Sequence, residues 1–184
     1  GGPVGGEPAR AGVGDPLGTA PRWGGFFYLG GNGSDRATRD RLFDTARAFF
    51  ALPDEDKFAV EMLGSPQFRG YTRFGGEYTQ GAIDWREQID LAAEYEPLGT
   101  EPGYLRLDGP NLWPTALPEF RDVLTDWQHR CGALGLRLMR EWARSLGADE
   151  SIFAEAFAAR PSAPPKPVGY PRREPDNPHG AGAP

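Results

Sequence analysis

A chain of 184 residues with a formal net charge of −6 is long enough for one domain with a buried core. Its charges of both signs are interspersed, which excludes the basic stripe of a typical nucleic-acid-binding protein. No run approaches the roughly 18 apolar residues of a membrane helix, and we expect no signal peptide. The single cysteine, Cys131, excludes an internal disulfide, so we expect a cytoplasmic protein.

Glycine and proline are concentrated at the two ends of the chain. In residues 1–24, prolines stand at Pro16 and Pro21. Because proline lacks an amide donor and clashes inside a helix, at most short helical pieces can form there. We therefore expect residues 1–24 to be poorly ordered and the middle of the chain to be globular.

An amphipathic helix is predicted over residues 35–51. Its apolar face consists of Leu42, Phe43, Ala46, Phe49 and Phe50, which repeat at helical spacing. Ser34 is suited to cap the N-terminus through its hydroxyl, and Leu52-Pro53 ends the helix. A further short turn of helix is expected over residues 54–62.

The longest helix is predicted over residues 117–146, with Gly147 as its stop. Its apolar stripe consists of Phe120, Leu124, Trp127, Cys131, Leu134, Leu138 and Trp142. Because Cys131 lies on that stripe, we interpret it as a small core residue and not as a nucleophile. His129 lies off the stripe and is expected to face solvent. A short helix is expected over residues 150–159.

Two short segments are typical of strands. The apolar run 26–29 is bracketed by glycines and is suited to a buried strand. Residues 84–91 alternate partly between apolar and polar, which predicts a second strand. Between them, residues 64–81 are rich in glycine and aromatic residues, and we expect a loop or irregular strand that can approach a ligand closely.

A pair of carboxylates, Asp84 and Glu87, lies in the second of these strands. Two neighbouring carboxylates can serve as general acid and base. No histidine or other third partner is close to them in the sequence, so we favour the interpretation of ordinary surface charge.

Four separated motifs carry a resemblance to a known family. They are Gly25-Phe26-Phe27-Tyr28-Leu29, Phe68-Arg69-Gly70-Tyr71, Gly109-Pro110-Asn111-Leu112-Trp113-Pro114 and Tyr170-Pro171. In this order they resemble the N-terminal half of the isopenicillin N synthase-like, iron(II)/2-oxoglutarate-dependent oxygenases. The third motif is similar to sequences in bacterial members, where its tryptophan and prolines have a structural role in the connector.

The resemblance implies an α+β fold, in which a helix-rich N-terminal region flanks a double-stranded β-helix, or jelly-roll, barrel. Residues 25–160 would form the non-haem dioxygenase N-terminal region, and residues 161–184 the entry to a barrel that is largely absent from this chain. Prolines at positions 164, 165 and 167 interrupt the strand expected before Tyr170.

Fe(II), 2-oxoglutarate and a small-molecule substrate are further implications of the resemblance, with oxidation of a C–H bond and release of succinate. Family members bind iron through a His-x-Asp motif and a second histidine. The two histidines here, His129 and His179, begin no such motif, and the family spacing puts the motif directly after Pro184. We therefore expect no catalytic residue and no metal ligand in these residues, and an inactive chain when it is alone.

Three residues are implied as binding residues. In the penicillin-forming branch, an arginine before a Gly-Tyr step binds a substrate carboxylate, which implies substrate binding by Arg69 and Tyr71. A guanidinium suits this role because it grips a carboxylate with two parallel bonds. The alternative is an ion pair of Arg69 with Glu77 or another acid. Tyr170 is implied as a 2-oxoglutarate-binding residue, although Val168 stands where relatives have an asparagine.

Two other functions stay open. The chain could be a non-catalytic binding or scaffold protein derived from this half alone, or part of a penicillin-synthase-like oxidase that does not use 2-oxoglutarate. We expect neither nucleic-acid nor membrane partners. Without a barrel, part of each helical stripe would remain exposed, so we expect self-association.

Overall fold

The computed structural model describes residues 28–96, 107–154, 157 and 165–170, and these belong to two compact units. The larger unit comprises the described parts of Ser34–Cys131 and Ser162–Pro184, and the smaller one those of Gly1–Gly33 and Gly132–Pro161. The predictions for residues 1–24, Phe26, Phe27, Pro164 and His179 lie outside the described residues.

Helix α2 spans Arg36–Phe50, close to the predicted bounds, but its cap differs from the prediction. The carboxylate of Asp35 accepts a hydrogen bond from the Thr38 amide at 2.7 Å, so Asp35 and not Ser34 is the N-cap. Asp35 has an extended backbone, with ψ at 171°, which brings its side chain over the free amides of the first turn. The hydrogen bonds from Thr38 hold the pKa of the Asp35 carboxyl below its ordinary value.

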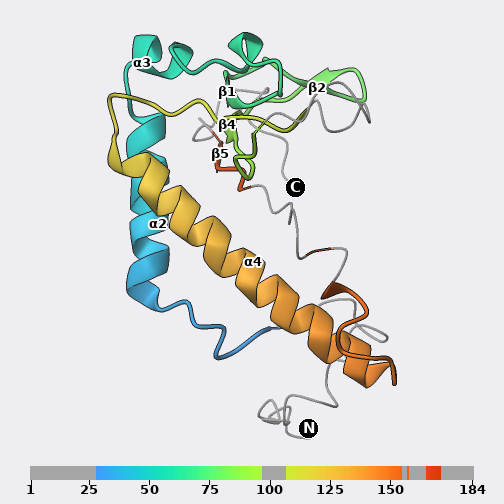
Figure 1. Cartoon of the computed structure of the whole chain (residues 1–184). Coiled ribbons are helices and arrows are strands. Elements are labelled where there is room, and N and C mark those ends of the chain that lie inside the picture. The colour runs from blue at the N-terminus through green and yellow to red at the C-terminus, as the bar shows by residue number, and fades with distance from the viewer. Residues whose placement is uncertain (1–27, 97–106, 155–156, 158–164, 171–184) are drawn as a thin grey trace, which may run out of the picture. The chain divides into compact units, whose positions relative to one another are not determined.

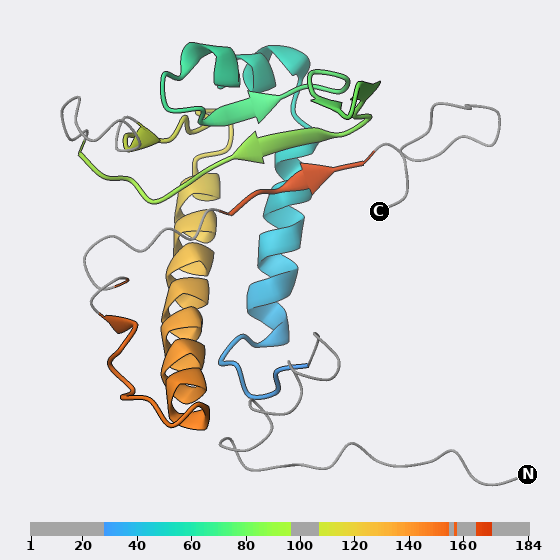
Figure 2. The same ribbon diagram turned by 90° about the vertical axis from the view of Figure 1, so that its right-hand side faces the viewer.

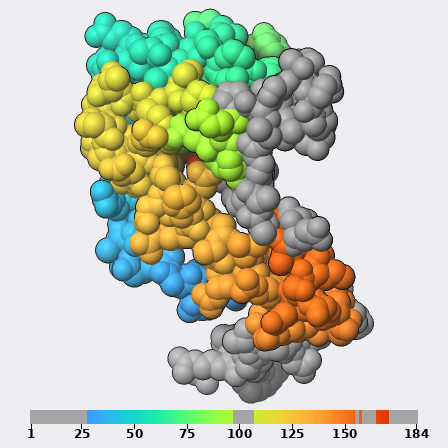
Figure 3. Space-filling view, in the orientation of Figure 1, coloured from blue at the N-terminus to red at the C-terminus, as the bar shows by residue number. Residues whose placement is uncertain are grey.

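Two short helical segments follow α2, where one short turn of helix was expected over residues 54–62. Helix α3 spans Asp54–Phe58, with Pro53 at its N-cap position, and the 3₁₀ helix η1 spans Met62–Gly64. Lys57 of α3 is only 6% exposed, which is unusual for a lysine and requires a buried partner. In Figure 3 the α3–η1 segment lies directly against the connector that precedes the long helix.

Helix α4 spans Glu119–Ser145 and confirms the long predicted helix. Gly147 ends it with a φ of +71°, a conformation that glycine adopts without a steric penalty. The amide of Ala148 donates to the carbonyl of Ala143 at 2.9 Å, and the amide of Gly147 to that of Arg144 at 3.0 Å. These two bonds form a Schellman motif, so the predicted stop is confirmed.

The apolar stripe of α4 is buried only over its first turns. Phe120 and Leu124 are buried, Trp127 is half-buried, and Cys131 is exposed. The prediction of a core Cys131 is therefore wrong. Helical spacing predicts which residues share a face, whereas burial depends on what packs against that face, and the main core cluster of the described residues includes Phe120, Val123 and Leu124 of α4.

A three-stranded antiparallel sheet lies beside the helices (Figure 1). Its strands, in spatial order, are β1 (Gly70–Thr72), β4 (Glu87–Asp90) and β5 (Val168–Gly169). Tyr71 pairs with Ile89, and Gln88 pairs with Val168. The strand predicted over residues 84–91 is thus confirmed over its second half.

A separate hairpin fills the glycine-rich segment between β1 and β4. It is built from β2 (Tyr78–Thr79) and β3 (Ala82–Ile83). The two turn residues, Gln80 and Gly81, both have positive φ values, 51° and 82°. This is the geometry of a tight hairpin turn that matches the twist of its strands.

Strand β5 forms in spite of the prolines before it. The Ile89 amide donates to the carbonyl of Pro167 at 3.1 Å, and the Leu91 amide to that of Pro165 at 3.3 Å. A proline on an edge strand has no amide to donate but still supplies a carbonyl. Each of these two prolines lacks the amide that would donate to the opposite chain, but its carbonyl still accepts a hydrogen bond from that chain. The pairing is therefore kept.

The core lies between one face of this sheet and the helices. Tyr71, Ile89 and Phe49 are at most 2% exposed, and the Phe49 ring centroid is 5.9 Å from that of Tyr71 and 4.9 Å from that of Phe120. Figure 2 shows α2 behind β4 and β5. Because side chains alternate along a strand, Thr72, Gln88 and Asp90 point to the opposite face.

The connector to α4 is fixed by polar contacts. The Asn111 side chain donates to the Ala92 carbonyl at 2.8 Å and accepts from the Ala92 amide at 2.9 Å. Glu94 accepts hydrogen bonds from the Asn111 amide, the Trp113 indole and Arg121. Burial acts to raise the pKa of the Glu94 carboxyl, but these donors outweigh it and lower that pKa. The predicted anchoring of the connector by Trp113 is confirmed, and the stiffening by its prolines stays a prediction.

The smaller unit departs from the prediction at its start. Tyr28 is fully exposed, Leu29 is 36% exposed, and neither lies in a strand. The prediction of a buried strand is wrong for these two residues, since a strand needs a neighbour to pair with and none of the described strands pairs with them. In the segment predicted as a short helix, residues 151–153 form a turn, and residues 154 and 157 are helical.

Candidate functional site

Arg69 is held at the entrance of β1 by a tightly folded loop. The hydroxyl oxygen of Ser65 accepts from the amide of Arg69 at 3.1 Å, and the backbone of Phe68 has a positive φ of 56°. The Arg69 guanidinium donates to the main-chain carbonyls of Gln67 and Leu107, both at 2.8 Å. The side chain is therefore fixed by backbone groups and not by an ion pair with Glu77.

One donor of this guanidinium has no partner among the described residues. The Nε–H of Arg69 is buried and makes no hydrogen bond within the described part of the chain. Burial lowers the pKa of Arg69, while the charges of Asp108 and Asp90 act to raise it. An arginine stays protonated in proteins under ordinary conditions, so this is a positioned cation with a donor to spare.

Tyr71 lies in the core and is only 2% exposed. Its hydroxyl donates to Oε2 of Glu87 at 2.7 Å, and the same oxygen is 3.2 Å from Nζ of Lys57. Lys57 also lies 3.2 Å from the Asp54 carboxylate and 3.5 Å from the Phe50 carbonyl. The predicted contact of Tyr71 with substrate stays a prediction, and its burial favours a role in fixing β1 and hence Arg69.

This network corrects the interpretation of Glu87 as surface charge. Glu87 is 6% exposed and lies on the helix-facing side of β4, together with Ile89. Asp84 is half-buried and lies within 3.2 Å of Arg86, and it accepts from the Thr79 hydroxyl at 2.7 Å. The two carboxylates have separate partners and do not form an acid–base pair.

The Tyr71 phenol makes the stability of the fold dependent on alkaline pH. Burial, together with the hydrogen bond to Glu87 and its charge, raises the pKa of Tyr71 above its ordinary value of about 10. Since the unfolded chain loses this proton first, the free energy of unfolding should fall as pH rises beyond about 10.

In Tyr71→Phe the free energy of unfolding should fall less steeply above a pH of about 10, because the titrating phenol is gone. At neutral pH the variant should be less stable by about 1–3 kcal/mol, because the hydrogen bond to Glu87 is lost. Urea unfolding of both proteins across that pH range measures the two slopes. Equal slopes would show that Tyr71 does not cause the decline.

The outward face of the sheet carries a polar cluster, which we define as Glu77, Asp84, Arg86, Gln88, Asp90 and Lys166. Glu77 bridges two of its members, accepting from Gln88 at 2.8 Å and from Arg86 at 3.0 Å. Gln88 also donates to Asp90 at 2.9 Å, and Asp90 lies 3.1 Å from Lys166 of the chain leading into β5. The cluster therefore ties β4, β5 and the hairpin segment together.

Tyr170 lies at the edge of this cluster, directly after β5. Its side chain is exposed, and its interaction with Arg86 helps to raise the pKa of that guanidinium, after the larger effect of Glu77. The Nε–H of Arg86 is buried and has no partner among the described residues. Tyr170 thus interacts with a member of the polar cluster, and the charge of Asp90 in this cluster acts on the pKa of Arg69.

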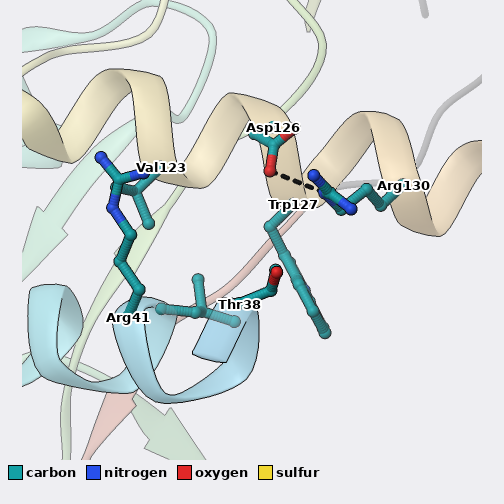
Figure 4. A pocket seen from close by; sticks show the side chains of 7 residues that line it. Thr38, Arg41, Val123, Asp126, Trp127 and Arg130 are labelled. Atoms are coloured by element: carbon teal, nitrogen blue, oxygen red, sulfur yellow. Dashed lines mark hydrogen bonds and ion pairs between the residues drawn. The ribbon is translucent and has the colours of Figure 1, made fainter. Parts of the chain in front are cut away.

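A concavity lies between α2 and α4, within the larger unit (Figure 4). It has a volume of about 100 Å³ and is lined by Thr38, Arg41, Leu42, Val123, Asp126, Trp127 and Arg130. Arg130 is paired with Asp126 at 2.7 Å, and both are exposed. Among the described residues that line it, none has a buried polar atom without a hydrogen-bond partner, so the polar cluster is the stronger candidate.

The described residues do not fit an iron ion. They contain no group of three or more His, Cys, Asp or Glu side chains placed to hold a metal. His129 is exposed on α4, as predicted. Within the same residues, no helix is long and apolar enough to cross a membrane.

Comparison with known sequences identifies the family. A family model described as non-haem dioxygenase in morphine synthesis N-terminal matches residues 3–116. The 2-oxoglutarate-dependent dioxygenase frbJ of Dothideomycetidae sp. (strain 11243) is 36% identical over 148 residues, which are 80% of this chain and 40% of that protein. The homoarginine-6-hydroxylase 2-ODD-C23.1 of Arabidopsis thaliana is 31% identical over 177 residues, covering 91% of this chain and 52% of that protein.

Solved structures agree with this assignment. JOX2 in complex with 2OG, Fe and JA has a TM-score of 0.60 and 27% identity, covering 82% of this chain and 42% of that one. A full-length Neurospora crassa protein in complex with alpha-KG has a TM-score of 0.51 and 29% identity, covering 66% and 37%. The chain belongs to the N-terminal family of the non-haem dioxygenases, whose cofactors are Fe(II) and 2-oxoglutarate. It spans about half the length, or less, of the relatives it matches.

Proposed function

We propose that this chain is the N-terminal part of an Fe(II)/2-oxoglutarate-dependent oxygenase that oxidises a small molecule. The observation that carries the proposal is the family match, which covers residues 3–116 and agrees with relatives named as 2-oxoglutarate-dependent dioxygenases. Bound Fe(II) and 2-oxoglutarate would supply the oxidising chemistry. We propose that the iron ligands belong to a further part of the protein, because this chain spans about half the length, or less, of the relatives it matches.

The role of this chain is to bind and orient the substrate. We propose that Arg69 binds a substrate carboxylate. Its guanidinium is fixed by two main-chain carbonyls, and its Nε–H is buried without a partner in the described part of the chain. A carboxylate oxygen is the acceptor that such a donor prefers. Tyr71 would support Arg69 from the core.

Tyr170 is proposed to contact 2-oxoglutarate. Two features support this role: its side chain is exposed, and it is held beside Arg86, a second guanidinium with a buried, unpartnered Nε–H. A dicarboxylate near these groups would accept from both. We further propose a cytoplasmic protein with no nucleic-acid or membrane partner, and self-association of the chain when it is produced alone, through exposed apolar faces of its helices.

Turnover by the protein expressed from its complete coding sequence tests this function. Succinate should form from 2-oxoglutarate in the presence of Fe(II) and a carboxylate-bearing substrate. Arg69→Leu should raise KM roughly tenfold to a hundredfold with little change in kcat, because the lost bond acts equally in the ground and transition states.

The matched control for this variant is Arg41→Leu, which removes an exposed arginine of α2 and should leave both constants unchanged. Arg69→Lys should recover little, since an ammonium cannot reproduce the planar fork. Succinate formation with an unaltered KM in Arg69→Leu would refute the role of Arg69 but leave the oxygenase assignment standing.

A further inference from the structure

One serine holds the backbone of the loop that leads to Arg69. The hydroxyl oxygen of Ser65 accepts from the amides of Gln67 and Arg69, at 3.3 and 3.1 Å. The carbonyl of Ser65 accepts from the amide of Phe68 at 3.2 Å. Three successive amides of the loop therefore converge on a single residue, and the hydroxyl bonds to the chain on both sides of Phe68.

Phe68 lies in the middle of this arrangement with a strained backbone. Its φ is +56°, a conformation that a bulky residue keeps only where its surroundings impose it. The Phe68 side chain is 66% exposed, so packing of the ring does not impose the conformation. The hydrogen bonds to Ser65 are then the contacts that hold the strain. Strain that neighbouring contacts maintain in this way is concentrated at binding and catalytic sites.

The conformation of Phe68 sets the direction of the Arg69 side chain. The guanidinium donates to the carbonyls of Gln67 and Leu107, which belong to two different segments. These segments are packed closely, since a Cβ built at Gly109 would lie 2.8 Å from Cγ of Gln67. A backbone rotation at Phe68 would turn the guanidinium away from both carbonyls, so its orientation depends on the strained conformation.

We propose that Ser65 is a positioning residue for substrate binding. Its hydroxyl holds Phe68 in the strained conformation and thereby keeps the guanidinium of Arg69 in one orientation towards a substrate carboxylate. The inference rests on the proposed function and deepens it. Its physical consequence is that Phe68→Gly makes the hydroxyl dispensable, because glycine adopts a positive φ without a steric penalty.

Hydrogen exchange of the Arg69 Nε–H, followed by NMR on the protein expressed from its complete coding sequence, tests this proposal. This group is buried, and its signal is assigned by its absence in Arg69→Leu. Ser65→Ala should speed its exchange about tenfold, as expected for the loss of a hydrogen bond that holds the loop. The amide of Ile89, in the core, should keep its wild-type rate, whereas a general loss of stability would speed the exchange of both groups.

Three further variants separate the hydroxyl from other effects. Ser65→Thr should keep the slow exchange, because threonine retains the hydroxyl and suits the extended backbone of Ser65, with a φ of −109° and a ψ of 115°. Adding Phe68→Gly to Ser65→Ala should restore the exchange rate to within about threefold of the wild type. The matched control is Ser145→Ala on α4, which removes a hydroxyl that donates to the Trp142 carbonyl and should leave the Arg69 signal unchanged.

Acetate, with acetamide as its uncharged match, probes the binding step in the same spectra. Acetate should shift the Arg69 signal of the wild type and bind about tenfold more weakly to Ser65→Ala. An unchanged exchange rate or acetate affinity in Ser65→Ala, an equal acceleration at Ile89, or no rescue by Phe68→Gly would each overturn the role of Ser65. The absence of any acetate shift in the wild type would instead refute the binding role of Arg69 in the proposed function.

Discussion

Gly70→Ala is expected to lower the free energy of unfolding by about 3 kcal/mol or more. Gly70 has a φ of +120°, a conformation that a residue with a Cβ rarely adopts. A Cβ built there would lie 2.4 Å from the Val60 carbonyl oxygen and 3.1 Å from a methyl carbon of Leu112. The same Val60 carbonyl accepts from the Tyr71 amide at 2.8 Å, so the clash would also break the bond that holds β1.

Two glycines of the same segment provide controls for this variant. Gly81 has a φ of +82° but no atom within 4 Å of a Cβ, so Gly81→Ala should cost only the backbone strain, about 1–2 kcal/mol. Gly64 has an open environment and no positive φ, so Gly64→Ala should be close to neutral. Urea unfolding of the three variants should rank them in this order. A Gly70→Ala variant no less stable than Gly81→Ala would contradict the close approach.

Lys57→Met is expected to lower the free energy of unfolding by about 3–5 kcal/mol, because it leaves the buried Glu87 carboxylate without its cation. Both side chains are 8% exposed, and Nζ of Lys57 lies 3.2 Å from Oε2 of Glu87. The Tyr71 hydroxyl would remain as a donor to Glu87 but carries no charge.

A double-mutant cycle isolates this interaction. Adding Glu87→Gln to Lys57→Met should recover part of the loss, since a neutral amide costs less to bury than an unpaired carboxylate. The matched control is Lys166→Met, which breaks a pair of similar length, 3.1 Å, with Asp90. That pair is far more exposed, so the control should cost less than about 1 kcal/mol. Equal losses in the two lysine variants would show that the Lys57–Glu87 pair is not desolvated.

The helices were predictable from the sequence because a single repeated spacing decides them. The Phe49 face of α2 and the Phe120 face of α4 both pack into the core. The spacing does not predict how much of a helix face is covered by the rest of the chain. Cys131 belongs to the same apolar stripe as Leu124 but is exposed, because the main core cluster does not extend along α4 as far as Cys131.

Strand predictions depended on partners that are distant in sequence. The prolines before β5 indicated a broken strand, yet their carbonyls complete the ladder with Ile89 and Leu91. Conversely, Tyr28 and Leu29 have a composition typical of a strand and no described neighbour to pair with. A local sequence pattern shows only that a segment is suited to a strand. The energy that stabilises the strand comes from its pairing with another segment of the chain.

For the candidate site, the family resemblance indicated Arg69 and Tyr170, whereas general chemistry gave no reason to prefer them over other polar residues. Lys57 and Gln88 were missed because lysine and glutamine are usually exposed. A signal was present: strict alternation along β4 places Glu87 and Ile89 on one face, so a buried Ile89 implies a buried Glu87 that needs a cation.

The measurement that tests the central claim most directly is the coding sequence beyond the codon for Pro184. We expect a His-x-Asp motif directly afterwards, followed by a second histidine, which together would supply the iron ligands. A stop codon at that point would contradict the oxygenase proposal and favour a binding protein derived from this half of the family.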